Sequence, residues 1–377
     1  MSKMRLPFLS AFLPALLLAG CHNLPPAPAH EYAYVANSGG NTVSVIDVAN
    51  LHVIQTLAVG KEPSQIVANP AKKEVYAVNS GADSISVIDA AANSVAATLP
   101  VQREPRAISI SADGRTGYVA NAGSNSVSVL DLEHRTLLGN VPVGEQPVDA
   151  VLSPSGKTVV AVNRGSNNVS LIDVASNRVR ATVGVCSQPG QAVILPNNRK
   201  FFVSCGGDNR IAVVDLVGGQ VIAYLHVGSP ATHLALKPDG GEIFVSENAS
   251  SAFAAINTTT NEIEESFLAG ANPARGLCSQ DNGFLYLSNT GSNTVDIINL
   301  ATRERMATVS VGSQPSALVL NRQQNKVLVV DSATGDVAVV RLDKRKDKKI
   351  LAPQPRLLSL IPVGIRPTQI AIKSWDN

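Results

Sequence analysis

The chain is poor in aromatic and charged residues. Aromatic side chains make up 4% of the 377 residues, with a single tryptophan, and charged side chains make up 16%, with a formal net charge of +2. So small a net charge gives no field that would attract nucleic acid, and no stripe of Lys and Arg with interleaved aromatics crosses the body of the chain. We therefore expect no nucleic-acid partner. The one dense basic run, residues 344–349, is interpreted as a solvated loop.

Motifs for catalysis and for metal binding are also missing. The sequence has no His-Glu-x-x-His, no Cys-x-x-Cys-His, no Gly-x-Ser-x-Gly and no phosphate loop. These absences predict no catalytic residue and no metal site, and they favour a binding protein over an enzyme. The six histidines are scattered along the chain at His22, His30, His52, His134, His226 and His233.

A hydrophobic run occurs only at the start of the chain. Lys3 and Arg5 precede an apolar run at 6–18 that is too short to span a bilayer, which predicts a signal peptide over residues 1–20. The Leu18-Ala19-Gly20-Cys21 sequence resembles the lipobox of bacterial lipoproteins, in which the Cys is acylated and becomes the first mature residue. A plain cleaved signal with an incidental Cys21 is the alternative.

Residues 21–30 are Pro-rich and are expected to be an extended tether between the acylated Cys21 and a single domain over residues 31–377. His22, rather than Asp, follows Cys21. By resemblance to enteric lipoproteins, this implies lipid anchoring on the periplasmic side of the outer membrane, with the inner membrane as the alternative.

The body of the chain repeats with a constant period of 42 residues. Four tetrapeptides that end in Asn define one column: Tyr34-Val35-Ala36-Asn37, Tyr76-Ala77-Val78-Asn79, Tyr118-Val119-Ala120-Asn121 and Val160-Ala161-Val162-Asn163, continued by Cys205, Glu247, Asn289 and Asp331. Ten residues later a second column, interpreted as turn residues, reads Asp47, Asp89, Asp131, Asp173, Asp215, Asn257, Asn299 and Arg341. A third column is proline: Pro63, Pro105, Pro147, Pro189, Pro273, Pro315 and Pro367, with Pro230 displaced by one position.

Each repeat contains four runs of strand length, such as residues 74–79, 84–89, 95–101 and 107–111, separated by turn-forming residues. One such unit cannot bury both faces of its sheet, so neighbouring units must stack, and the array must be capped or closed. The chain starts within a unit, with a strand at 31–37, and ends with a lone first strand at 368–373. Pairing of these two ends predicts an all-β fold, an eight-bladed β-propeller with four-stranded antiparallel blades, closed by the C-terminal strand. A seven-bladed ring is the alternative.

The three columns together resemble the YVTN-type β-propeller repeat family, named for a Tyr-Val-Thr-Asn tetrapeptide. Segments such as Ser44-Val45-Ile46-Asp47 and Val59-Gly60-Lys61-Glu62-Pro63 carry the resemblance beside the tetrapeptides, over nearly the whole mature chain. Many members of that family have seven blades, whereas eight copies are counted here, with an insertion near 343–355 in the last one.

Three cysteines lie beyond Cys21. Cys186 precedes a first strand and Cys205 ends the following second strand, so an antiparallel hairpin that turns near 196–199 would bring them together. We expect either a disulfide, since exported domains meet an oxidising compartment, or two free thiols. Cys278 shares a column with Leu152, Ile194 and Leu236 and is interpreted as a buried, inert thiol.

One ring of polar positions is the candidate ligand site. In a propeller the first strands line a central channel, and converging polar groups at its mouth are the default binding-site hypothesis. Two residues beyond the proline column lie Gln65, Ala107, Asp149, Gln191, His233, Arg275, Ala317 and Gln369. Arg106 precedes one of them, and the alternative is a mouth that is only hydrated.

Two functional interpretations remain open from the sequence. The first is a monomeric binding or scaffolding lipoprotein for a periplasmic protein or a small molecule. The second is a cofactor-handling or enzymatic propeller, because some eight-bladed periplasmic propellers of similar repeat pattern bind haem d1 and others act as lactonases or lyases. His233 and Arg275 would be the residues to test, and this second interpretation depends on fold analogy alone.

Overall fold

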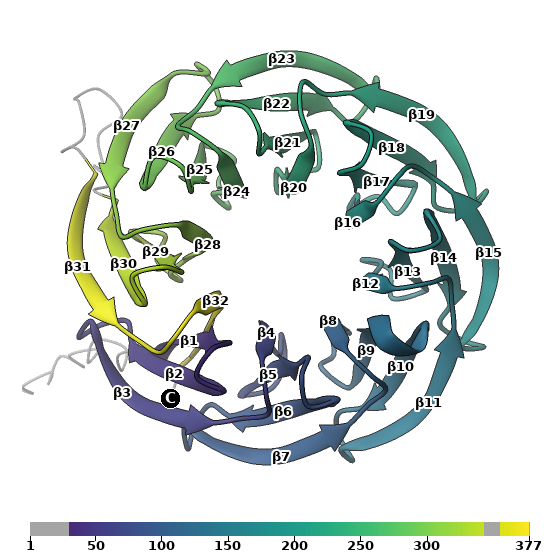
Figure 1. Ribbon diagram of the computed structural model, residues 1–377, viewed down its shortest axis with the longest axis horizontal. Helices are drawn as coiled ribbons and strands as arrows, with labels where there is room; N and C mark the ends of the chain where they lie inside the picture. The colour runs from purple at the N-terminus through teal and green to yellow at the C-terminus, as the bar shows by residue number, and fades with distance from the viewer. Residues whose placement is uncertain (1–29, 343–354, 377) are drawn as a thin grey trace, which may run out of the picture.

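The computed structural model describes residues 30–342 and 355–376, which form eight four-stranded antiparallel sheets arranged as a ring (Figure 1). The eight-bladed propeller expected from the repeat is confirmed. The predicted signal peptide, Cys21, the predicted tether up to residue 29 and residues 343–354 of the expected insertion lie outside the described residues. No helix in the described part of the chain is long and apolar enough to cross a membrane.

Each blade is named here after its first, innermost strand. The first strands are β4 (Pro63–Ala68), β8 (Pro105–Ile110), β12 (Pro147–Leu152), β16 (Pro189–Ile194), β20 (Ala231–Leu236), β24 (Pro273–Cys278), β28 (Pro315–Leu320) and β32 (Pro367–Trp375). The second strands are β1 (His30–Asn37), β5 (Glu74–Asn79), β9 (Thr116–Asn121), β13 (Thr158–Asn163), β17 (Lys200–Cys205), β21 (Glu242–Glu247), β25 (Phe284–Asn289) and β29 (Lys326–Asp331).

The two outer strands of each blade follow the second strand directly. The third strands are β2 (Thr42–Asp47), β6 (Ser84–Asp89), β10 (Ser126–Asp131), β14 (Asn168–Asp173), β18 (Arg210–Asp215), β22 (Ala252–Asn257), β26 (Thr294–Asn299) and β30 (Asp336–Arg341). The fourth strands are β3 (His52–Ala58), β7 (Ser94–Pro100), β11 (Thr136–Pro142), β15 (Arg178–Gly184), β19 (Gln220–His226), β23 (Glu262–Leu268), β27 (Arg305–Ser310) and β31 (Arg356–Pro362). A short 3-10 turn, η1 (Ala122–Ser124), follows β9.

The two ends of the chain close the ring in one sheet. Its strand order is β3-β2-β1-β32, and β1 pairs with β32 from His30 opposite Trp375 to Asn37 opposite Pro367. Strand β1 begins at His30, one residue before the expected strand. Because β32, from the C-terminal part of the chain, completes the sheet that contains β1, every blade has four strands and the ring is closed.

The core lies between neighbouring blades. Val160 and Val162 of one blade form a cluster with Phe201 and Val203 of the next, and all four are fully buried. The second and third strands are therefore nearly continuous apolar runs, since both faces of each sheet are covered. The second column consists of turn residues as expected: Asp47 Oδ1 accepts the N–H of Ala49 at 2.8 Å.

Candidate functional site

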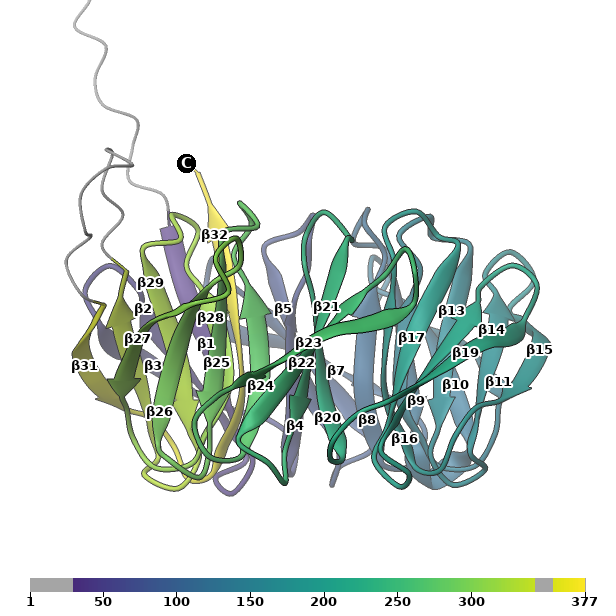
Figure 2. The same cartoon turned by 90° about the horizontal axis from the view of Figure 1, so that it is seen from above.

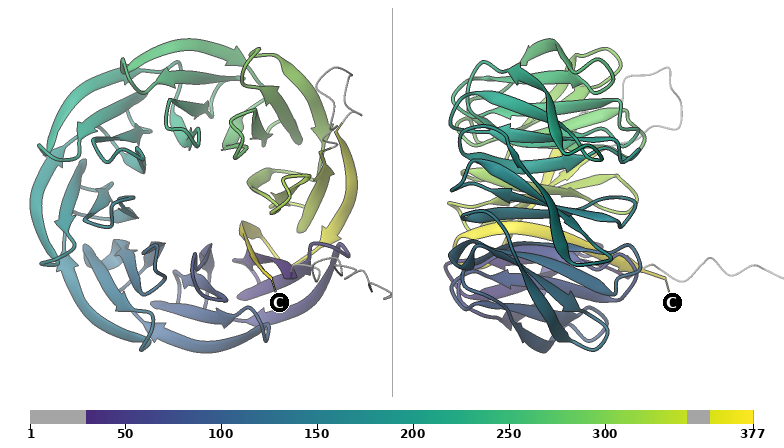
Figure 3. Two further views of the ribbon diagram at one scale, coloured as in Figure 1. Left: turned by 180° about the vertical axis from the view of Figure 1, so that it is seen from behind. Right: turned by 90° about the vertical axis from the view of Figure 1, so that its right-hand side faces the viewer.

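The rim of the channel, as we call it here, is the face formed by two kinds of loop in each blade: the segment before the first strand and the turn after the second. In the β4 blade these loops are joined by hydrogen bonds, in which the N–H of Ser80 donates to Glu62 O at 3.1 Å and that of Gly81 to Lys61 O at 3.0 Å. Strand β1 begins and β32 ends on the opposite face, where the side views show the end of β32 projecting from the ring (Figures 2 and 3). The rim therefore faces away from the start of β1 and the end of β32.

Three adjoining hollows of about 430, 630 and 770 Å³ lie on the rim, and Arg106 lines each of them. Arg106 is exposed and pairs with Glu104 at 3.4 Å. The hollows also bring together charged residues that were not predicted from the sequence. They lie in the segments before the proline column or after the Asn column: Lys61, Glu62, Asp83, Arg103, Glu104, Glu145, Arg164 and Arg366. The equivalent loops before β16, β20, β24 and β28 carry no charged residue. These loops are residues 186–188, 228–230, 270–272 and 312–314.

The other predicted residues lie below the rim, on the innermost strands. Gln65, Asp149, Gln191, His233, Arg275 and Gln369 are all partly exposed, whereas Ala107 and Ala317 are buried. The structure therefore separates the predicted set into Arg106 on the rim and a ring of side chains on the channel wall. Whether these residues bind a ligand remains a prediction.

Four of the wall side chains accept a hydrogen bond from the backbone of the next blade. Gln65 Oε1 accepts the N–H of Ile108 at 2.7 Å, and Gln191 Oε1 accepts that of Leu234 at 2.9 Å. The other two bonds are longer, from Ala192 to Asp149 Oδ2 at 3.3 Å and from Gly276 to His233 Nδ1 at 3.4 Å. A first strand is the inner edge of its sheet, so its inward N–H groups have no partner strand. The side-chain acceptors from the preceding blade bond these N–H groups and thereby connect neighbouring blades.

The wall shifts the pKa values of its titratable groups. Burial raises the pKa of Asp149 to about 6, an effect that backbone N–H donors and Arg275 oppose. Burial also lowers the pKa of His233 to about 3, helped by the nearby positive charge of Arg275, so this imidazole is neutral at physiological pH. The pKa of Arg275 is itself lowered by burial, against the attraction of Asp149.

Arg275 breaks the pattern of acceptors, because a guanidinium has only donors. With its amide oriented so that Oε1 faces the guanidinium, Gln369 accepts from Arg275 Nη1 at 3.0 Å and Nη2 at 2.6 Å. Arg275 is on β24 and Gln369 on β32, so the contact passes over the small Ala317 of β28.

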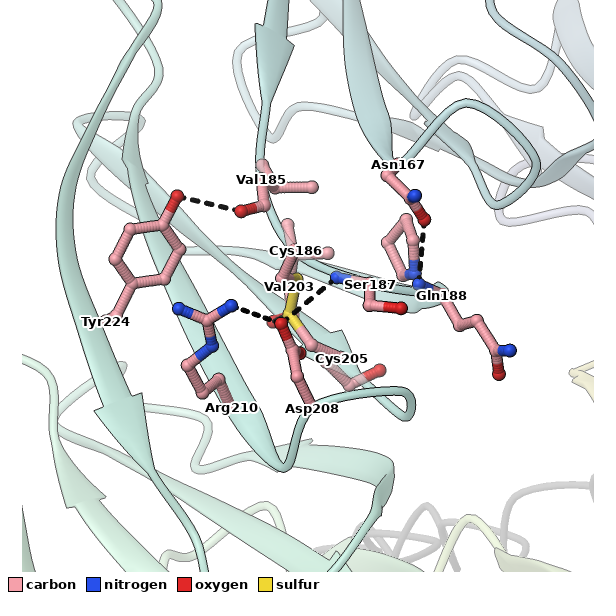
Figure 4. The surroundings of a disulfide bond; sticks show 12 residues. Asn167, Val185, Cys186, Ser187, Gln188, Val203, Cys205, Asp208, Arg210 and Tyr224 are labelled. Atoms are coloured by element: carbon pink, nitrogen blue, oxygen red, sulfur yellow. Dashed lines mark hydrogen bonds and ion pairs between the residues drawn. A yellow bond between two sulfur atoms is a disulfide. The ribbon is translucent and has the colours of Figure 1, made fainter.

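Cys186 and Cys205 are joined in a disulfide with Cα atoms 5.7 Å apart (Figure 4). Cys186 stands where six other repeats have Gly, and Cys205 stands in the Asn column. At Gly60 an added Cβ would lie 2.7 Å from Asn79, so the disulfide links two positions that are already in contact in other blades. A carboxylate oxygen of Asp208 and the two sulfurs lie within 4.8 Å of one another, but bonded sulfurs are not thiolates and Asp208 pairs with Arg210.

A buried carboxyl group was missed at the sequence level. Asp331, in the Asn column, is fully buried opposite the partly buried Asp336, and burial, helped by the negative charge of Asp336, raises its pKa to about 8. Its Oδ2 accepts the N–H of Gly312 at 3.0 Å. The signal that could have found it is an acid in a column where the sister repeats have Asn. Cys278 is buried and free, as expected.

Comparisons with known proteins agree with this architecture. Among solved structures, dihydro-heme d1 dehydrogenase NirN in complex with DHE is similar at 14% identity and a TM-score of 0.74, over 93% of this chain and 76% of that one. Kuenenia stuttgartiensis hydrazine synthase is similar at 21% identity and a TM-score of 0.62, over 74% of this chain and 95% of that one. A functionally unknown protein from Desulfotomaculum acetoxidans DSM 771 is similar at 12% identity and a TM-score of 0.60, over 90% and 98%.

At these identities the similarity shows the fold alone. None of the curated proteins compared with this chain matches it. The model of the YNCE-like β-propeller family matches residues 100–347, which is more than half of the sequence. The chain belongs to the YNCE-like β-propeller family.

Proposed function

We propose that this propeller is a binding or scaffolding module that presents its rim to a partner protein. The observation that carries the proposal is the group of three hollows that share Arg106. Small-molecule sites are mostly enclosed and apolar with a few polar groups. These hollows are instead lined by five cationic and four acidic side chains: Lys61, Arg103, Arg106, Arg164 and Arg366 with Glu62, Asp83, Glu104 and Glu145. Such mixed charge suits the polar surface of a protein better than a small ligand.

The direction of the rim supports a membrane-anchored role. The proposed anchor is an acylated Cys21 on the periplasmic side of the outer membrane, in a lipoprotein with YVTN-type repeats. Because the described chain begins at His30 on the face opposite the rim, a tether from that point would direct the rim away from the lipid. A partner in the periplasm could then reach all three hollows.

A capture experiment with periplasmic extract tests the proposal. The immobilised mature protein is compared with Arg106→Glu and with Arg115→Glu, which reverses an exposed charge in the turn between β8 and β9, on the opposite face. We expect one or more proteins to be retained by the wild type and by Arg115→Glu but lost from Arg106→Glu, as identified by mass spectrometry. Identical sets from all three proteins would contradict a rim site.

A cofactor-handling role is the second candidate, because the similar structure of dihydro-heme d1 dehydrogenase NirN is a complex with DHE. The wall histidine fits axial iron ligation poorly. His233 Nδ1 accepts the N–H of Gly276, so its proton lies on Nε2, and that nitrogen has no free lone pair for a metal. A visible absorption band in protein purified from the native host, lost in His233→Gln, would favour the cofactor over the scaffold.

A further inference from the structure

The channel wall carries a positive charge that no carboxylate pairs with directly. Of the ion pairs in the described part of the chain, none includes Arg275. The carboxylate that acts on it is Asp149, which lies on β12, three blades from β24 around the ring. Its hydrogen-bond partner is the neutral amide of Gln369.

Burial makes this arrangement incomplete without a ligand. The guanidinium keeps its charge, because its ordinary pKa is far above physiological pH, yet it has given up part of its hydration. A neutral amide oxygen replaces that hydration less well than an anion, since charge-assisted hydrogen bonds are the stronger ones. An anion that reaches the channel would therefore gain more here than at an exposed arginine.

The neighbouring side chains add a second donor and no competing charge. Ala317 occupies the wall position between Arg275 and Gln369, and its methyl group is buried in the core, so no polar side chain from that strand competes for the guanidinium. On the other side His233 uses Nδ1 as the acceptor for Gly276, which leaves Nε2–H as a neutral donor one blade away from Arg275.

We propose that Arg275, with Gln369 and His233 beside it, is a binding site for the carboxylate group of a small organic anion that enters the channel. A planar guanidinium matches the two oxygens of a carboxylate. A phosphate group offers the same oxygens but carries more negative charge, which Asp149 on the same wall repels. The site lies below the rim and does not depend on the proposed protein partner.

Ligand-observed NMR on the purified mature protein tests the site. Sodium benzoate is the carboxylate probe, followed by saturation transfer, and inorganic phosphate is the competing probe, followed by ³¹P line width. Arg275→Gln removes the charge and places there the side chain that the wall has at Gln65 and Gln191. Arg115→Gln is the matched control, because it removes one positive charge from an arginine whose side chain is 65% exposed.

We expect saturable benzoate binding by the wild type at millimolar concentration, weakened about tenfold or more in Arg275→Gln and unchanged in Arg115→Gln. Phosphate should bind more weakly than benzoate. Equal benzoate binding by Arg275→Gln, no saturable binding by the wild type up to about 10 mM, or tighter binding of phosphate would each overturn the proposal. Circular dichroism and the melting temperature show whether each variant is folded. Loss of a captured protein in Arg106→Glu is a separate readout, so the two proposals can fail independently.

Discussion

Two arcs of the channel wall use the same backbone position in opposite ways. From β4 to β20, wall side chains such as Gln65 and Gln191 accept an N–H from the next blade, and beside the buried Ala107 the hydroxyl of Ser109 accepts that of Leu152 at 3.2 Å. From β24 to β32 the wall holds Arg275, Ala317 and Gln369, and the contact between Arg275 and Gln369 links side chains two blades apart. A side-chain acceptor at this position bonds a backbone N–H of the next blade, whereas the Arg275 guanidinium, which has only donors, leaves a positive charge on the channel wall. The repeat therefore fixes the fold without fixing the chemistry of the wall.

The largest expected effect comes from the covalent link in the first arc. Replacing both cysteines by serine, Cys186→Ser with Cys205→Ser, removes a disulfide between residues 19 apart in the chain. We expect the free energy of unfolding to fall by about 3 kcal/mol, because the unfolded chain loses its constraint. Denaturant unfolding followed by circular dichroism measures the change.

The matched variant for this test restores the contact of the sister blades. Cys186→Gly with Cys205→Asn recreates the Gly and Asn pair seen at Gly60 and Asn79. It should recover little of the loss, because Ala212 stands where the sister blade has Ser86, the residue that accepts from Asn79 at 3.0 Å, and the amide introduced by Cys205→Asn therefore lacks that acceptor. Equal midpoints for wild type and the double serine variant would show that the link adds no stability to this arc.

The second effect concerns the carboxyl of the first arc. Asp149 has a pKa of about 6 in the folded protein against 3.8 ordinarily, so the folded state binds its proton more tightly than the unfolded state. The resulting contribution to the free energy of unfolding is complete below pH 3.8 and is lost as the pH rises through about 6. Asp149→Asn should remove this dependence, which amounts to about 2 kcal/mol between pH 4 and pH 7. Melting temperatures across that range measure it.

His233 supplies the contrast, because its pKa of about 3 lies below the ordinary 6.5. Its contribution is complete above pH 6.5 and is lost as the pH falls toward 3. Asp149→Asn and His233→Gln should therefore change the slope of stability against pH with opposite signs. Slopes that change in the same direction would mean that the wall does not hold these groups as described.

The smallest effect compares one residue from each arc. Gln191→Ala should lower the free energy of unfolding by about 1 kcal/mol, because the N–H of Leu234 loses its acceptor. Arg275→Gln should instead raise it by about 0.5 kcal/mol, since a partly desolvated charge is removed. Denaturant midpoints measure both changes in the free energy of unfolding. If both variants were less stable than the wild type, the two arcs would not differ in the way described.

The blades and their closure followed from the sequence because three columns keep one period. The strands expected at 74–79 and 84–89 agree with β5 and β6, and the terminal strand pairs with β1 as expected. Each of these features depends on local patterns, in which apolar runs alternate with turn residues. Periodicity alone was enough to place them.

The wall and the rim were harder to predict. Spacing placed Gln65 and Arg275 on the channel, but it could not show that Gln65 is bound to the next blade while Arg275 reaches Gln369. Those contacts depend on how far each blade is rotated against its neighbour. The hollows around Arg106 arise from loops of four different blades, and no single repeat contains the information for them.

The sheet that closes the ring also determines how the molecule would respond to a mechanical load. Strand β1 lies between β2 and β32, with hydrogen bonds along both edges. These bonds run perpendicular to the strands, so a pull on residue 30 along the strand axis would strain both ladders at once instead of opening them bond by bond. The point where the chain enters the propeller is thus built to resist tension.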